Sequence, residues 1–141
     1  MGLPIRTMNT KNPSFIKEFD LDLKYGEAGE EWLRLLPGTG KIEVKTERHW
    51  WTKTGNVFFE YECRGAPSGL AVTTADWWCH ILQRGDQRVL AYIWHVPILK
   101  ASLKRMYAEG KAIRTVGGDY RMSVGLLVPV KELYLITALE E

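Results

Sequence analysis

The first half of the chain carries two regular patterns of hydrophobic and polar positions. Apolar residues at helical spacing predict a helix over residues 23–36, which a Pro-Gly-Thr-Gly turn ends. Residues 41–48 and 57–63 instead alternate between apolar and polar side chains, as a strand with one buried face does. Because only a short connection with a Thr-Gly-Asn turn separates these two strands, we expect them to pair as an antiparallel hairpin.

The second half predicts two further strands and a second and third helix. Residues 69–72 are interpreted as a short third strand, and a threonine suited to N-capping precedes a helix over residues 75–83. An apolar run over residues 88–96, rich in β-branched and aromatic side chains, predicts a buried strand. A proline suited to the first turn then opens a helix over residues 97–110, which ends at a glycine.

The tail adds a turn at Gly117–Asp119, an apolar stretch over residues 124–130 and a short last element over residues 133–139. This order of elements predicts the α/β (α+β) fold class, with a small mixed sheet flanked by helices. No repeat, linker or low-complexity tract divides the chain, so we expect one domain over residues 1–141 with an irregular N-terminal arm over residues 1–19.

The composition is that of a folded protein. Of 141 residues, 45% are hydrophobic and 26% are charged, which argues against disorder. The net charge of +2 neither requires nor excludes a nucleic-acid partner. Two cysteines are too few for a disulfide framework, so we expect reduced thiols in a cytoplasmic protein. The chain has no signal-peptide pattern and no apolar run of about 18 residues, so we expect no membrane partner.

The segment Glu43-Val44-Lys45 is the sharpest candidate for chemistry. On a strand, Glu43 and Lys45 project from one face, so a carboxylate suited to Mg²⁺ or Mn²⁺ stands beside an ammonium that can stabilise charge on a phosphate. If the hairpin forms, Glu60 falls on the same side, and Glu30 reaches over the sheet edge from the preceding helix. Such a set would make a phosphodiesterase site. The same alternation also keeps the outer face of a half-exposed sheet soluble, and the tripeptide alone does not separate these interpretations.

Several segments spread along the chain occur together in one known group of proteins. They are Phe19–Glu27, Ile42–Glu47, Thr54–Tyr61, Pro67–Leu70, Thr74–Trp78 and Gly117–Asp119. In the order and spacing of these segments, residues 19–130 resemble phage and bacterial proteins of the PD-(D/E)XK nuclease superfamily. The resemblance implies a restriction-endonuclease-like core and metal-dependent hydrolysis of DNA phosphodiesters.

The resemblance also implies site residues and partners. A helix glutamate, a strand acid and a Glu-x-Lys pair together hold one or two divalent ions in this superfamily, Mg²⁺ first and Mn²⁺ also accepted. The helix motif, a glycine followed four residues later by glutamate, matches Gly26 and Glu30, with Glu27 and Glu31 as close alternatives. The Glu-x-Lys pair matches Glu43 and Lys45. The archaeal-type Holliday junction resolvases of the superfamily are homodimers with two sites facing one junction. The implied partners are therefore branched DNA and a second copy of the chain.

The chain departs from those resolvases in one respect. They carry a strand with an aspartate between the first helix and Glu-x-Lys, whereas only residues 37–41 separate the two here. Either Glu60 or Glu47 supplies the missing acid, or the site is incomplete; we favour Glu60, because a paired neighbouring strand restores the proximity. Three interpretations stay open: a Holliday junction resolvase, a nuclease for duplex or nicked DNA, and a catalytically inactive DNA-binding module.

Basic and aromatic side chains in three regions are candidates for DNA contact. The regions are the connection between the first two strands, the turn after the second strand and the helix over residues 97–110. The candidates are Arg48, His49, Trp50, Trp51, Lys53, Arg64, Lys100, Lys104 and Arg105. An alternative for Trp50 and Trp51 is packing against the protein or a dimer partner.

Overall fold

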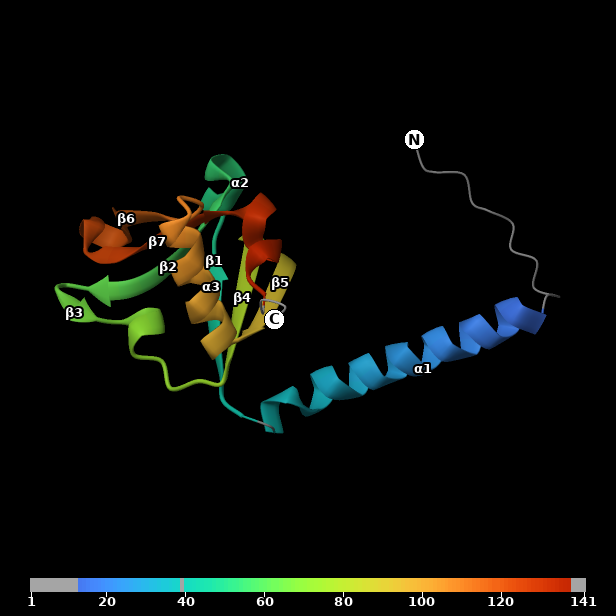
Figure 1. The fold of residues 1–141 in the computed structure, drawn as a ribbon. Coiled ribbons are helices and arrows are strands. Elements are labelled where there is room, and N and C mark those ends of the chain that lie inside the picture. Colours follow the sequence, from blue (N-terminus) through green and yellow to red (C-terminus); the bar gives the residue numbers. More distant parts are fainter. Residues whose placement is uncertain (1–12, 39, 138–141) are drawn as a thin grey trace. The chain divides into compact units, whose positions relative to one another are not determined.

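The computed structural model describes residues 13–38 and 40–137 (Figure 1). The chain divides into two compact units, residues 1–39 and residues 40–141, and each is described by itself.

The first unit contains α1, which spans Pro13–Leu35, followed by the 3-10 helix η1 over Leu36–Gly38. The helix ends where the sequence predicts and begins earlier. Residues 13–19, predicted as part of an irregular arm, are therefore helical, while residues 1–12 lie outside the described part of the chain. No helix among the described residues is long and apolar enough to cross a membrane.

The second unit contains a three-stranded sheet with the order β1-β4-β5. Its strands are β1 over Ile42–Glu47, β4 over Trp77–Arg84 and β5 over Gln87–His95. β1 runs parallel to β4, and β4 and β5 form an antiparallel hairpin. Because parallel strands need a crossover connection, the chain between β1 and β4 leaves this sheet and contributes strands to the other one.

The other sheet is four-stranded and antiparallel throughout, with the order β3-β2-β7-β6. Its strands are β2 over Asn56–Cys63, β3 over Ala66–Pro67, β6 over Ile113–Gly117 and β7 over Ser123–Pro129. Helical segments connect and flank the strands (Figure 1). They are α2 over Trp50–Thr54, η2 over Gly69–Ala71, α3 over Val96–Ala108, η3 over Asp119–Arg121 and η4 over Val130–Leu135.

One hydrophobic core is shared by both sheets, α3 and η4. Phe59 of β2 and Trp78 of β4 are buried in the same cluster as Leu99 and Leu103 of α3 and Leu133 of η4. The buried positions of α3 recur every three or four residues, so one stripe of that helix faces the core. Every buried residue of this cluster lies between residues 57 and 136.

The mixed α+β fold class is confirmed, with two sheets and flanking helices. The predicted hairpin of β1 with β2 is wrong, because β1 pairs with β4 and β2 pairs with β3 and β7. The predicted helix over residues 75–83 is also wrong, because this segment forms β4. Trp78 and Leu82 are four residues apart, as on one face of a helix. His80, midway between them, is buried as well, so every second residue is buried, as in a strand. The Gly85-Asp86 pair between two apolar runs was the missed signal for a hairpin.

Smaller differences concern short or exposed elements. Residues 69–72, predicted as a strand, hold η2, and β6 was not predicted. The strand at 88–96 exists as β5, but it is not buried throughout, since Val89 is 41% and Leu90 44% exposed.

Candidate active site and nucleic-acid interface

Three charged residues of β1 lie on the interior side of the three-stranded sheet. They are Glu43, Lys45 and Glu47, and their partners in register on β4 are Trp78, His80 and Leu82. Neighbours in register share a face of a sheet, and all three partners are buried, whereas Val44 on the opposite face is 58% exposed. The prediction that Glu43 and Lys45 share a face is confirmed, and the face is the one directed toward the core side of the sheet.

The Glu43 carboxylate is held by the loop that precedes β4. Its Oε2 atom accepts a hydrogen bond from the Thr73 hydroxyl, whose oxygen in turn accepts the backbone N–H of Ala75 at 3.1 Å. Lys45, two residues further along β1, is exposed. An oriented carboxylate therefore stands beside an ammonium that a ligand can reach from solvent.

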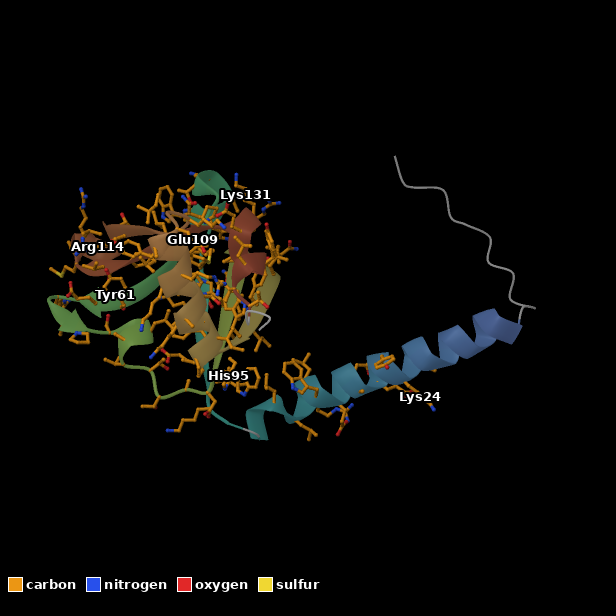
Figure 2. All side chains as sticks on the ribbon, viewed as in Figure 1. Lys24, Tyr61, His95, Glu109, Arg114 and Lys131 are labelled. Atoms are coloured by element: carbon orange, nitrogen blue, oxygen red, sulfur yellow. The ribbon has the colours of Figure 1, made fainter. Side chains whose placement is uncertain are left out.

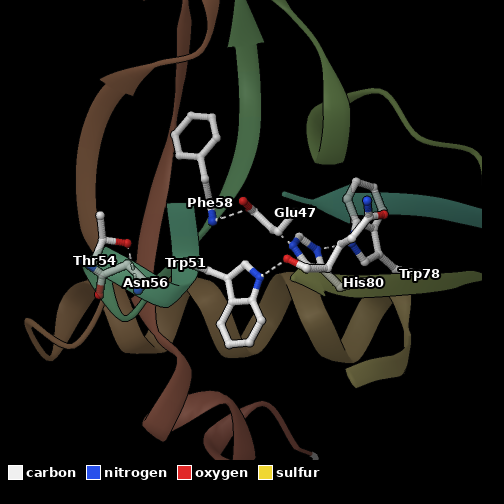
Figure 3. Close-up of polar contacts among 8 residues, drawn as sticks. Glu47, Trp51, Thr54, Asn56, Phe58, Trp78 and His80 are labelled. Carbon is white, nitrogen blue, oxygen red and sulfur yellow. Dashed lines mark hydrogen bonds and ion pairs between the residues drawn. The ribbon is translucent and has the colours of Figure 1, made fainter. Parts of the chain in front are cut away.

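The Glu47 carboxylate connects three strands (Figure 3). Its Oε1 atom accepts the backbone N–H of Phe58 at 2.7 Å and lies 3.3 Å from Nε2 of His80, whose Nδ1 accepts the indole N–H of Trp78 at 3.1 Å. This network satisfies an N–H of β2 that the β7 pairing leaves open, so β1 and β2 meet through a side chain and not through the predicted backbone ladder.

The same network assigns the ring proton of His80. An indole N–H can only donate, so Nδ1 of His80 accepts and the proton of the neutral ring is on Nε2, directed at Glu47. His80 is 0% exposed and Glu47 17% exposed at the side chain. His80 therefore has a structural role as a hydrogen-bond donor and is out of reach of a substrate. The Oε1 atom of Glu47 is the acceptor in this network, so its first role is structural as well.

Glu60 of β2 is engaged by two serine hydroxyls. Its Oε2 atom accepts the hydroxyl of Ser68 at 3.0 Å, and its Oε1 atom accepts the hydroxyl of Ser123 of β7. An ideal Cβ on Gly69 would lie 2.3 Å from the carbonyl oxygen of Glu60, so η2 packs directly on this strand. Thr73, which holds Glu43, donates its backbone N–H to the Gly69 carbonyl at 3.0 Å. The loop around η2 therefore contacts both Glu60 and Glu43.

The other predicted metal ligands, Glu27 and Glu30, lie on α1 in the first unit. Among the described residues, no group of three or more His, Cys, Asp or Glu side chains is arranged to hold a metal ion. Mg²⁺ commonly keeps several waters and binds one or two carboxylates together with substrate phosphates. The Oε2 atom of Glu43 accepts the Thr73 hydroxyl, and its second carboxylate oxygen is of the type that such a partial site uses as a metal ligand.

The two tryptophans of α2 have different surroundings. Trp50 is 63% exposed, with the Lys53 ammonium 5.1 Å from its ring centroid and the His49 ring at 5.1 Å. Trp51 donates its indole N–H to the Gln83 carbonyl at 2.7 Å and packs against the core (Figure 3). Of the two rings, only that of Trp50 is exposed enough for the stacking predicted for this region, while Trp51 anchors α2 to the end of β4.

A second exposed basic region lies at the far end of β2. Arg64 donates its backbone N–H to the Met122 carbonyl at 2.9 Å, which places it beside Tyr120 and Arg121 of the β6–β7 connection. All three of Arg64, Tyr120 and Arg121 have positive φ, and Tyr120 is 89% exposed. Tyr120 and Arg121 are not among the residues predicted to contact DNA, although the Gly-Gly-Asp turn that precedes them indicates an exposed loop. An eight-residue strand separates this region from α2, which is about 25 Å at the usual rise per residue.

The three predicted cations of α3 divide into two kinds. Arg105 donates to the Leu135 carbonyl at 2.9 Å and so ties α3 to η4, which is a structural role. Lys100 and Lys104 line a cavity beside α3.

Cys79 is a poor candidate for a nucleophile. Both Cys63 and Cys79 are free thiols, as predicted. Burial raises the pKa of the Cys79 thiol, which lowers the fraction of reactive thiolate at neutral pH.

Comparison of the chain with protein-family models, with characterised proteins and with solved structures finds no match.

Proposed function

We propose that the chain is a Mg²⁺-dependent DNA endonuclease that acts as a homodimer on branched DNA, with a four-way junction as the first candidate substrate. The observation that carries the proposal is the pair on β1: the Glu43 carboxylate, oriented by Thr73, beside the exposed Lys45 on the same face. The resemblance of residues 19–130 to PD-(D/E)XK nucleases gives this pair its expected chemistry.

A bound divalent ion supplies a water of lowered pKa and polarises the phosphate. Glu43 would hold that ion, since Thr73 engages only one of its two carboxylate oxygens. Lys45 sets its ammonium beside the phosphate and stabilises the negative charge that develops on its oxygens. Glu60 ranks behind Glu43 as a ligand, because both of its carboxylate oxygens accept serine hydroxyls. Glu47 ranks behind it because its side chain is only 17% exposed and its Oε1 atom already serves Phe58 and His80.

The test is cleavage of a synthetic four-way junction, beside linear duplex and single strands, in Mg²⁺ and in EDTA. We expect paired, metal-dependent cuts in the junction that Lys45→Ala slows by about 100-fold or more, the usual effect of removing one charge-stabilising donor. Lys41→Ala is the matched control, because Lys41 is also exposed and directly precedes β1. Equal loss in both variants would assign the effect to general charge and remove Lys45 from the site.

Thermal melting tests the metal independently of cleavage. An ion that binds only the folded state raises the melting temperature, so Mg²⁺ or Mn²⁺ should stabilise the parent chain and not Glu43→Ala. The same shift in both would show that the ion binds elsewhere.

A second candidate is a DNA-binding module without nuclease activity. The observation in its favour is the absence of a three-carboxylate group within the described residues, together with the capture of both Glu60 oxygens by serine hydroxyls. Tight junction binding with no cleavage in Mg²⁺ or Mn²⁺ would select this candidate.

A further inference from the structure

A cavity of about 460 Å³ lies in the second unit among β2, η2, α3 and β7. This volume falls within the range of roughly 300–1,000 Å³ typical of small-molecule sites. Its lining residues are Phe59, Tyr61, Leu70, Ala71, Lys100, Leu103, Lys104, Tyr107 and Leu126. Three of them are almost closed to solvent, with Phe59 1%, Leu70 6% and Leu103 4% exposed, so the surface open to a ligand comes from the other lining residues.

The cavity carries positive charge and no negative charge. Lys100 and Lys104 are four residues apart on α3, so their side chains lie on one side of the helix. Within the part of the chain that the structure describes, neither lysine forms an ion pair. Arg114 of β6 is the register partner of Leu126, so a third cation occupies the same face of the four-stranded sheet, one strand away. An anion at this rim would interact favourably with both lysines, which otherwise repel each other.

Aromatic side chains make up the rest of the wall. Phe59, Tyr61 and Tyr107 contribute three rings to the lining, and rings of this kind hold a planar group by stacking or edge contacts. Tyr107 is 54% exposed and stands on α3 three residues after Lys104, at the cationic rim. An apolar and aromatic lining with two lysines at its rim favours a ligand that is aromatic at one end and anionic at the other.

We propose that this cavity binds a planar aromatic group with an anionic substituent, a carboxylate or a phosphate, whose ring lies against Tyr61 and Tyr107 and whose charge meets Lys100 and Lys104. The proposal does not depend on the nuclease assignment, because neither Glu43 nor Lys45 lines the cavity. Such a ligand can be a free aromatic acid or a nucleotide, and the two sources are separated below.

The test is calorimetric titration of the full chain, in EDTA, with three probes that share one ring system: 1-naphthyl phosphate, neutral 1-naphthol and cationic 1-naphthylmethylammonium. We expect the phosphate to bind about tenfold tighter than the neutral probe, as two partly exposed charge pairs allow, and the cation to bind weakest. Thymidine 5′-monophosphate is the second arm. Its competition with naphthyl phosphate identifies a nucleotide as the ligand, and its failure to compete identifies a free aromatic anion.

Variants locate the binding. The double variant Lys100→Gln/Lys104→Gln should bring naphthyl phosphate down to the affinity of naphthol, and Ala71→Phe should weaken all probes by filling the cavity. The matched control is Lys41→Gln/Lys131→Gln, which removes the same charge from exposed positions outside the lining; Lys131 lies well apart from Tyr61 (Figure 2). Unchanged binding in both the Lys100/Lys104 and the Ala71 variants, equal binding of the three probes, or no binding of any probe would overturn the proposal.

Discussion

At the scale of single residues, Glu47 shows how a side chain can replace a backbone ladder. Its Oε1 atom accepts from Phe58 on β2 and lies within hydrogen-bonding distance of His80 on β4. The sequence shows a glutamate on the polar face of a strand, and that pattern is equally typical of a solvated surface. What decides the role of Glu47 is His80, which is 33 residues away in the chain and therefore invisible to local periodicity.

Replacement of Glu47 should separate the effect of its acceptor oxygen from that of its charge. Glu47→Ala leaves the Phe58 and His80 N–H groups without an acceptor, and we expect it to lower the free energy of unfolding by about 3 kcal/mol. Glu47→Gln keeps an oxygen in place and should cost less than about 1 kcal/mol. Urea unfolding measures both. Similar values for the two variants would mean that the carboxylate charge, and not the hydrogen-bond acceptor, stabilises the junction of the sheets.

At the scale of elements, the short loop around η2 contacts both Glu60 and Glu43. The absence of a side chain at Gly69 allows this loop to pack directly on β2. Gly69 has a φ of +50°, and an ideal Cβ there would meet the Glu60 carbonyl oxygen at 2.3 Å. Backbone cannot yield as a flexible side chain does, so Gly69→Ala should destabilise the fold by about 3 kcal/mol or more. Gly85→Ala is the matched control, since its φ is +56° with nothing within 4 Å, and should cost about 1 kcal/mol. Equal costs would show that η2 moves away from β2 without penalty.

The two tryptophans of α2 should have different roles, Trp50 in DNA contact and Trp51 in stability. Trp50→Ala removes an exposed ring and should weaken binding of single-stranded or branched DNA by about tenfold, as the loss of one base-stacking contact does, with little change in stability. Trp51→Phe removes the hydrogen bond to the Gln83 carbonyl and should lower the free energy of unfolding by about 1 kcal/mol while DNA binding is kept. Fluorescence anisotropy and urea unfolding on both variants check this; a reversed pattern would place the contact surface elsewhere.

Elements could be predicted from the sequence where local pattern and final environment agree. β1, β2 and α3 were found because their alternation or helical spacing is strong within each segment. β4 was missed because aromatic residues at positions 77 and 78 and an apolar residue at 82 satisfy a helical and an extended pattern alike. The partner of β1 could not be predicted, since the pairing of Glu43 with Trp78 joins distant parts of the chain across a crossover. For the site, the shared face of Glu43 and Lys45 followed from the period of a strand, but the hydroxyls of Thr73 and Ser123 that hold the acids did not.

At the scale of the whole molecule, the fold and the proposed activity make different demands on the chain. The buried core cluster lies entirely between residues 57 and 136, within the unit over residues 40–141. A compact unit with its own core folds alone as a rule. The helix glutamate that the nuclease resemblance requires, Glu30, is instead on α1 of the first unit. Stability should therefore depend on the second unit.

A truncated chain of residues 40–141 tests this separation. We expect it to unfold cooperatively in urea, because every member of the core cluster is retained. In the full chain, Glu30→Gln and Glu27→Gln change the two exposed helix glutamates that the resemblance names, and both variants should keep the stability of the parent chain. An unfolded truncation would show that residues 1–39 complete the fold. A folded truncation that still cuts the junction would show that Glu43 and Lys45 act without the helix glutamates.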